Sequence, residues 1–284
     1  EHTYTSSASI GVARFPQDGV HTNDLIMRAD EAMYRSKQAG KGCISFYDAT
    51  VQKEIEARRI VENSLKDAVG NGEFYILYQP QLHIPTNQLR GIAVHVCWDS
   101  PTGTTLSPHE FLPLTEETGA ILDVGKWVLQ CACNDYVKVR TSYKIPPMLT
   151  VEVSHKQLRA PHFISDIERI IQSTTMNVEN LELSISATKE LFSEKIAATL
   201  VRLHGMGIHI MLHIDYAEET AFDILSKFQV DSVKIAYSLV RTLFEKEAFI
   251  KKLLAFCHKR NLPVLAEDVT ETAQLQFLTE HNCN

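Results

Sequence analysis

The chain has no long apolar run, no excess of positive charge and no CxxC cysteine pair. No apolar run approaches the ~18 residues expected of a membrane span, and no signal-peptide pattern is present. The net charge of −7 excludes the basic footprint of non-specific nucleic-acid binding, so we expect no nucleic-acid partner. Without a CxxC pair among the six cysteines, neither a structural zinc site nor a redox pair is predicted. These absences favour a cytoplasmic protein with reduced thiols, and they are compatible with a membrane-anchored parent.

The length and the composition are those of a globular protein. The chain has 284 residues, of which 44% are hydrophobic and 22% are charged. Such a length accommodates one large domain and part of another. Because the sequence begins at Glu1 and not at a methionine, we expect a fragment of a longer protein.

Residues 1–48 follow a strand–helix–strand pattern. Alternating apolar residues over 5–15 predict a strand, helical spacing from Thr22 to Gly40 predicts a helix, and a short strand is predicted over Ile44 to Tyr47. The segments SIGVA at 9–13 and ADEAMYRSKQAGKG at 29–42 resemble the C-terminal end of GGDEF (diguanylate cyclase) domains. The resemblance implies a partial α+β scaffold, because the catalytic loop of that family lies upstream of the matching part.

Residues 49–69 predict a helix that connects two domains. Charged and apolar residues alternate throughout this segment, which is typical of a partly exposed helix. Two roles remain open for it, a rigid spacer or a signalling element that transmits a rotation or a change of register.

Over residues 70–284, strands and helices alternate in units of roughly 30 residues. This alternation predicts a parallel sheet with helical crossovers, and about seven strands favour an α/β fold of the TIM-like (β/α)8 barrel type whose last strand is missing. The predicted strands are 74–82, 90–97, 148–154, 180–186, 208–214, 231–235 and 262–266. The predicted helices are 107–118, 123–140, 161–174, 189–205, 217–227, 240–260 and 271–280.

Short motifs along residues 74–284 point to one family. They are YQPQ at 78–81, GIAVHVCW at 91–98, LSPHEFLPLTEETGAI at 106–121, GKWVLQCAC at 125–133, LELSI at 181–185, VDSVKI at 230–235 and AEDV at 266–269. Together they resemble the EAL domains, a family of cyclic di-GMP phosphodiesterases. The resemblance implies a barrel that holds two divalent cations with acidic side chains at the carboxyl ends of its strands.

Most positions that hold the cations in EAL domains carry other residues in this chain. The resemblance places the glutamate of the Glu-Ala-Leu motif at Ala93, the strand-three asparagine at Glu152 and the strand-four glutamate at Ser184. It places the paired aspartates of strand five at His213 and Ile214. The site is therefore predicted to be degenerate.

On the last two strands the substitutions are incomplete. The strand-six lysine is retained as Lys234 and the strand-seven glutamate as Glu267, whereas the aspartate after the lysine is Ala236. Carboxylates that cluster without cations repel one another and are costly to bury, so a coordinated loss of acids is what a metal-free site requires. We therefore predict no catalytic residue, no catalytic metal and no cofactor.

Three of the remaining polar residues are expected to converge at the barrel mouth. Glu152, His213 and Glu267 offer two carboxylates and one imidazole, a set that can bind a transition metal. The alternative, which we favour, is that Glu152 or Glu267 forms a buried ion pair with Lys234 while His213 hydrogen-bonds locally.

A possible ligand side is also retained by resemblance. Gln79, Pro80, Pro108 and Phe111 correspond to the nucleotide-binding side of EAL domains, which is compatible with binding without hydrolysis. Against binding, Cys97 replaces an arginine whose bidentate contact with phosphate a cysteine cannot reproduce.

Three hypotheses of function follow. We favour a catalytically inactive regulatory module of a GGDEF–EAL signalling protein that works through a protein partner of unknown identity. The alternatives are a non-hydrolysing cyclic di-GMP receptor and a residual metal-dependent phosphodiesterase. A homodimer is expected by resemblance only.

Overall fold

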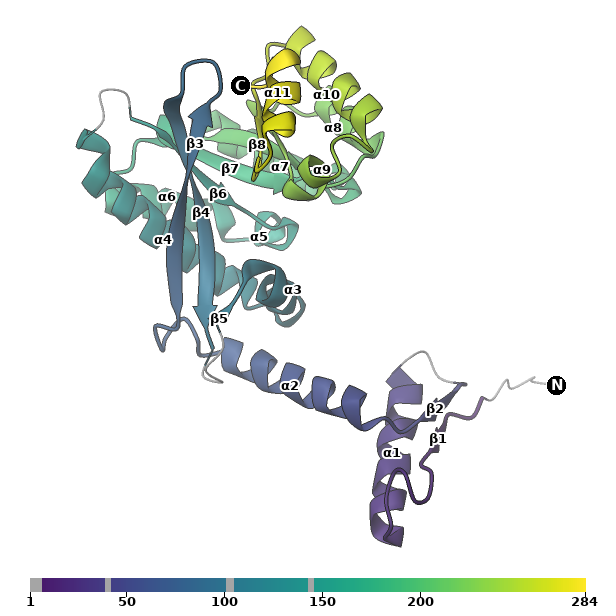
Figure 1. The fold of residues 1–284 in the computed structure, drawn as a ribbon. Coiled ribbons are helices and arrows are strands. Elements are labelled where there is room, and N and C mark those ends of the chain that lie inside the picture. Colours follow the sequence, from purple (N-terminus) through teal and green to yellow (C-terminus); the bar gives the residue numbers. More distant parts are fainter. Residues whose placement is uncertain (1–6, 39–41, 101–104, 143–145) are drawn as a thin grey trace, which may run out of the picture. The chain divides into compact units, whose positions relative to one another are not determined.

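The computed structural model describes residues 7–38, 42–100, 105–142 and 146–284, and it divides into two compact units, Glu1–Ser64 and Leu65–Asn284. Figure 1 shows the elements of both. Each unit is described below by itself.

The first unit is a two-stranded parallel sheet with a helix packed on it. Strand β1 (Ile10–Val12) pairs with β2 (Ile44–Phe46), and helix α1 (Thr22–Gln38) lies between them in sequence. Helix α2 (Ala49–Leu65) follows and occupies most of the predicted connector. The predicted strand over 5–15 and helix over 22–40 are confirmed at their centres, and parts of both ranges lie outside the described residues.

The second unit is built on a curved eight-stranded sheet with helices on its outer side (Figure 1). Its strands are β3 (Phe74–His83), β4 (Gln88–Asp99), β5 (Thr105–Leu106), β6 (Met148–Glu152), β7 (Leu181–Ser186), β8 (His209–Ile214), β9 (Ser232–Ile235) and β10 (Val264–Ala266). The spatial order is β10-β9-β8-β7-β6-β4-β3, with β5 paired to β4. The seven strands predicted from sequence are all present in this path, which does not close within the described residues.

Helices connect the strands. They are α3 (Pro108–Thr118), α4 (Ile121–Val139), α5 (His155–Arg159), α6 (Phe163–Thr174), α7 (Glu194–Gly205), α8 (Thr220–Lys227), α9 (Tyr237–Arg241), α10 (Glu247–Lys259) and α11 (Thr272–Glu280), with short 3-10 turns at Arg140–Ser142, Val178–Asn180 and Lys189–Phe192.

The two faces of the sheet have opposite character because strand side chains alternate with a period of two residues. The register aligns apolar residues across β6, β7, β8 and β9 on one face, for example Val151 with Leu183 and Leu212 with Val233, and all are buried. The same register aligns polar residues on the other face, for example Glu152 with Ser184 and His213 with Lys234. The concave interior of the sheet is therefore polar, and the core lies between the sheet and the helices.

Two expectations of the fold are wrong in detail. The sheet is not parallel throughout, because β3 and β4 pair antiparallel as a hairpin in which Asn87 takes a left-handed conformation with φ 53°. The helix predicted over 240–260 is two helices, α9 and α10, and the one predicted over 189–205 begins as a 3-10 turn before α7.

Candidate functional site

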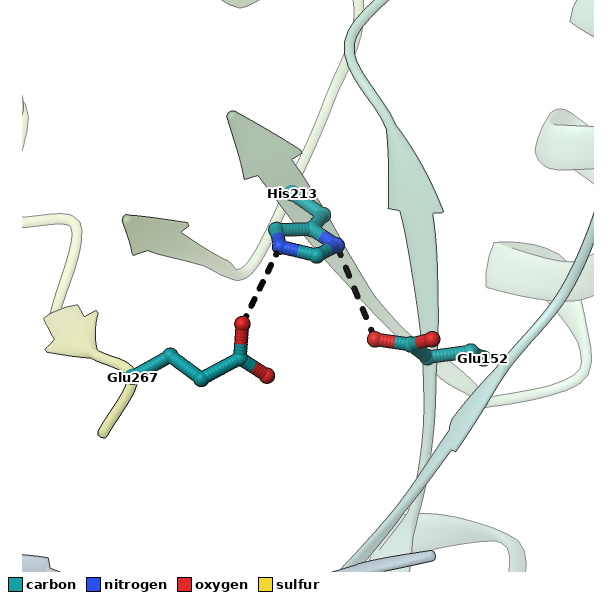
Figure 2. A group of neighbouring side chains, drawn as sticks. All are labelled: Glu152, His213 and Glu267. Atoms are coloured by element: carbon teal, nitrogen blue, oxygen red, sulfur yellow. Dashed lines mark ion pairs between the residues drawn. The ribbon is translucent and has the colours of Figure 1, made fainter. Parts of the chain in front are cut away.

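Four polar side chains converge at the carboxyl ends of the parallel strands. Glu152 is the last residue of β6, His213 lies near the end of β8, Lys234 lies in β9, and Glu267 directly follows β10. Because parallel strands end at the same edge of a sheet, residues far apart in sequence meet there. Figure 2 shows the imidazole of His213 between the carboxylates of Glu152 and Glu267.

Lys234 pairs with both carboxylates. Its Nζ donates to Glu152 Oε1 at 2.7 Å and to Glu267 Oε1 at 3.0 Å, and its side chain is 6% exposed. The predicted ion pair is confirmed and involves both acids, but only the Glu267 side chain, at 17% exposed, is buried, whereas that of Glu152 is 46% exposed. Glu267 Oε2 also accepts from the backbone N–H of Tyr237, at 3.2 Å, at the start of α9.

The prediction that His213 hydrogen-bonds locally is wrong. Its Nδ1 lies 3.6 Å from Glu152 Oε1, and its Nε2 lies 3.6 Å from both Asp215 Oδ1 and Glu267 Oε2. These separations are longer than hydrogen bonds. Nε2 is buried and has no hydrogen-bond partner within the described part of the chain. The imidazole is therefore surrounded by carboxylates without being bonded to any.

Charge decides the protonation of this cluster. Burial alone lowers the pKa of Lys234, but the charges of Glu152 and Glu267 outweigh burial and raise the pKa above its usual value. Burial alone raises the pKa of Glu267, but His213 and Lys234 hold it well below its usual range. The pKa of Glu152 is likewise lowered, because Lys234 and His213 outweigh burial. At neutral pH both acids are ionised and the lysine is charged.

The other positions predicted as a degenerate site carry no ionisable side chain. Ala93 lines the same cavity as Lys234 and Glu267, and Ser184 lines the same cavity as Glu152 and His213. Ile214 points to the opposite face of β8 from His213 and is 1% exposed. Ala236 is buried and precedes α9.

Two cavities open beside the cluster. One of about 390 Å³ is lined by Gln79, Pro80, Ala93, Lys234, Glu267 and Asp268, among others. The second, of about 220 Å³, is lined by His95, Pro108, Glu152, Ser184 and His213 together with valines of the helices and strands. Gln79, Pro80 and Pro108 therefore lie at cavities, as expected of a ligand side.

Phe111 lines neither of these two cavities, and the prediction that it lines a ligand side is wrong. It is 0% exposed and packs in an aromatic cluster with Phe74, at 5.7 Å between ring centroids, and with Trp98, at 5.9 Å. The apolar pattern around it reflects the core.

A second polar network lies deeper on the concave face and was not predicted. Glu182, 1% exposed, accepts from Arg90 at 2.6 and 2.7 Å, from Thr150 at 2.8 Å and from Ser232 at 2.7 Å. The alternation of Glu182 and Ser184 with leucines was the only sequence signal for this network, because the partners of Glu182 come from three other strands.

A chain of hydrogen bonds joins the first and last strands of the sheet. His95 Nε2 donates to Gln79 Oε1 at 2.8 Å, and Gln79 Nε2 donates to Asp268 Oδ1 at 2.7 Å. The residues therefore bridge β4 and β3 to the segment after β10.

The donors present do not fit a pair of divalent cations. Within the described ranges, one group of His, Cys, Asp and Glu side chains can reach a common ion, and it consists of Glu152, His213 and Glu267. Two bridged cations require more anionic oxygens than two carboxylates supply. Moreover, Lys234 already neutralises one of the two negative charges.

Comparison with family models identifies the fold. The model described as EAL domain matches residues 62–284, and the model described as diguanylate cyclase, GGDEF domain, matches residues 1–43. The chain therefore belongs to the EAL domain family, and its N-terminal segment resembles part of a GGDEF domain. Both expected resemblances are confirmed.

Curated relatives match almost the whole chain. An uncharacterized signaling protein of Caulobacter vibrioides is 28% identical over 281 residues, which cover 97% of this chain and 34% of that protein. The bifunctional diguanylate cyclase/cyclic di-GMP phosphodiesterase MucR of Pseudomonas aeruginosa is 25% identical over 287 residues, which cover 100% of this chain and 42% of that protein. The chain thus spans less than half the length of these relatives.

Solved structures share the fold. A PaMucR phosphodiesterase in complex with c-di-GMP superposes with a TM-score of 0.73 at 23% identity, over 79% of this chain and 92% of that chain. The FimX EAL domain of Pseudomonas aeruginosa bound to c-di-GMP superposes with a TM-score of 0.69 at 20% identity, over 78% and 91%. The predicted barrel-type α/β fold is confirmed by these likenesses. No helix in the described ranges is long and apolar enough to span a membrane.

Proposed function

We propose that this EAL domain is a catalytically inactive regulatory module of a GGDEF–EAL signalling protein in the cyclic di-GMP network, and that it acts through a protein partner. Its place in that network is supported by the family and by relatives such as MucR, whose description combines cyclase and phosphodiesterase activities.

One observation carries the proposed inactivity. The two carboxylates that converge with an imidazole at the strand ends, Glu152 and Glu267, are already bridged by the ammonium group of Lys234. Two bridged cations require more anionic oxygens than these two carboxylates supply. The positions at which further acids could compensate carry neutral residues, namely Ala93, Ser184, Ile214 and Ala236.

Exposed apolar side chains on β3 support a role in protein contacts. Tyr75, Leu77, Tyr78 and Leu82 are between 37% and 54% exposed. Large apolar side chains that lie exposed close together are typical of surfaces that contact another protein.

A turnover assay tests the proposed inactivity. With cyclic di-GMP and Mg²⁺ or Mn²⁺, we expect no linear dinucleotide above the buffer control, whereas the phosphodiesterase domain of MucR serves as the positive control. Product that forms with this protein and is lost in Glu267→Gln would refute the proposal and favour a residual phosphodiesterase.

A receptor for cyclic di-GMP is the second candidate. It is favoured by the cavity of about 390 Å³ beside Gln79 and Pro80. It is disfavoured by charge, because Glu267 and Asp268 also line that cavity and the only cation lining it within the described residues, Lys234, is engaged in ion pairs. Calorimetry decides: saturable heat that disappears in Gln79→Ala supports the receptor, and no heat at high micromolar ligand rejects it.

A further inference from the structure

We propose that Glu152, His213 and Glu267 form a site for one transition-metal ion of the Zn²⁺ class, and that Lys234 acts as a tethered cation with which the ion competes. The site is distinct in kind from the pair of oxygen-bound cations implied by the family. It does not depend on the proposed signalling role, since one bound ion can be present with or without turnover.

The geometry of the three side chains carries this inference. Their potential ligand atoms all lie within 4.8 Å of one another. His213 Nε2 lies 3.6 Å from Glu267 Oε2. Two ligand atoms of a tetrahedral zinc ion are separated by about 3.4 Å, given bond lengths of about 2.0–2.2 Å. The spacing between His213 Nε2 and Glu267 is thus too long for a hydrogen bond and close to that around a bound ion. Glu152 lies nearest the other ring nitrogen, Nδ1, so its carboxylate must turn toward the ion on binding.

Two unpartnered polar atoms provide a second observation. His213 Nε2 is buried without a hydrogen-bond partner among the described residues. Ser184, which is 1% exposed and lines the same cavity as Glu152 and His213, also has a buried hydroxyl oxygen without a partner in the described part of the chain. Buried polar atoms without partners are costly, and a ligand or a metal-bound water at this cavity would satisfy them.

The mix of donors selects the class of ion. Imidazole nitrogen together with carboxylate oxygen suits Zn²⁺ and its neighbours in the transition series, whereas Mg²⁺ prefers oxygen ligands alone. The carboxylates carry two negative charges and Lys234 returns one positive charge, so the cluster remains attractive to a cation. Lys234 holds one oxygen, Oε1, of each acid, so the ion competes with its ammonium group for the charge of the two carboxylates.

Recruitment of Glu267 by an ion has a structural consequence. Its Oε2 accepts from the backbone N–H of Tyr237, the first residue of α9. An ion that recruits this oxygen draws electron density from a hydrogen bond at the start of that helix. Occupancy of the site is therefore linked to the short segment that connects β9 to α10.

Titration of the metal-free protein with Co²⁺, followed by visible absorption and by calorimetry, tests the proposal. We expect one ion per chain, a spectrum that reports nitrogen ligation, and displacement by Zn²⁺. Because the cysteines can also bind these ions, the decisive comparison is between two histidine variants on β8. His213→Ala should weaken binding roughly 100-fold, and His209→Ala, four residues earlier on the same strand, should leave it unchanged.

A third variant tests the competition. Lys234→Met should tighten binding roughly tenfold, because the tethered cation is removed while the three ligands remain. The inference is overturned if no saturable one-to-one binding is found, if His213→Ala binds as the unaltered protein does, or if two equivalents of Mg²⁺ bind instead. Absence of phosphodiesterase activity in the loaded protein bears only on the proposed function, so the two can fail separately.

Discussion

At the scale of single residues, Glu182 shows how this fold keeps a charge inside its concave face. Four donor groups from Arg90, Thr150 and Ser232 reach its two oxygens, and the residue is 1% exposed. Burial alone raises the pKa of Glu182, but the hydrogen bonds and charge of Arg90 outweigh burial and leave the pKa below its usual value of 4.5. The carboxylate is ionised in the folded protein because all of its hydrogen bonds come from donors, which stabilise the charged form.

The lowered pKa of Glu182 predicts a contribution to stability that is lost in acid. Because the pKa of Glu182 is lower in the folded protein than in the unfolded chain, the unfolded chain takes up a proton first as the pH falls. The stabilisation is fully present above about pH 4.5 and is lost as the pH falls through the folded-state pKa. Urea denaturation at a series of acidic pH values measures it.

Glu182→Gln provides the comparison for that experiment. It removes the ionisation and keeps an oxygen for Arg90, so the free energy of unfolding of the variant should change less with pH than that of the unaltered protein. Parallel pH profiles for the two proteins would contradict the prediction.

At the scale of elements, Gly11 sets how closely helix α1 lies on strand β1. A Cβ atom at this position would lie 1.9 Å from the carbonyl oxygen of Ala29 and 2.2 Å from the backbone nitrogen of Met33. Both atoms belong to the helix backbone, which cannot move aside as a flexible side chain can. The helix packs on the strand because the position has no side chain.

Gly11→Ala should therefore destabilise the first unit by about 3 kcal/mol or more, at the upper end of overpacking effects. Hydrogen exchange of the α1 amides measures the effect, which should be confined to that unit. Gly205→Ala is the matched control, because its Cβ has no atom within 4 Å and alanine is favoured in helices. Equal exchange of α1 in the two variants would refute the explanation.

The elements also show what can be predicted from sequence. The alternation of leucines with Glu182 and Ser184 predicted β7. Apolar patterns of this kind also predicted the other six strands of the main path in the second unit. The strand β3 was predicted, but its antiparallel pairing with β4 was not, because strand patterns carry no direction, although the Pro85–Asn87 turn was a signal for a hairpin. The division between α9 and α10 was missed because no glycine or proline lies between Thr242 and Lys246.

At the scale of the whole molecule, the chain divides into two units, and the buried apolar residues of the described part lie almost entirely in the second. The residues that bury β6 to β9, such as Leu183, Ile210 and Val233, all belong to the second unit, Leu65–Asn284. We expect residues 65–284 alone to unfold within about 2 °C of the midpoint of the second unit in the whole chain. Calorimetry on both forms measures this, and a large downward shift on truncation would show that the first unit contributes to the stability of the second.

The candidate site was only partly predictable at this scale. The family resemblance placed Glu152, Lys234 and Glu267 at strand ends, and opposite charges at one edge predicted their ion pair. The environment of His213 could not be predicted, because it depends on distances of 3.6 Å set by the curvature of the sheet. Arg90 and Glu182 are 92 residues apart in sequence, and only the strand order brings them together.

The hydrogen bond between Gln79 and Asp268 connects residues that are 189 positions apart. Neighbouring strands elsewhere in the sheet are joined by ladders of backbone hydrogen bonds, whereas here a side-chain amide and a carboxylate span the seam between β3 and the end of β10. A single amide side chain, that of Gln79, makes this contact while it also accepts from His95. Replacing Gln79 would therefore release His95 and Asp268 together.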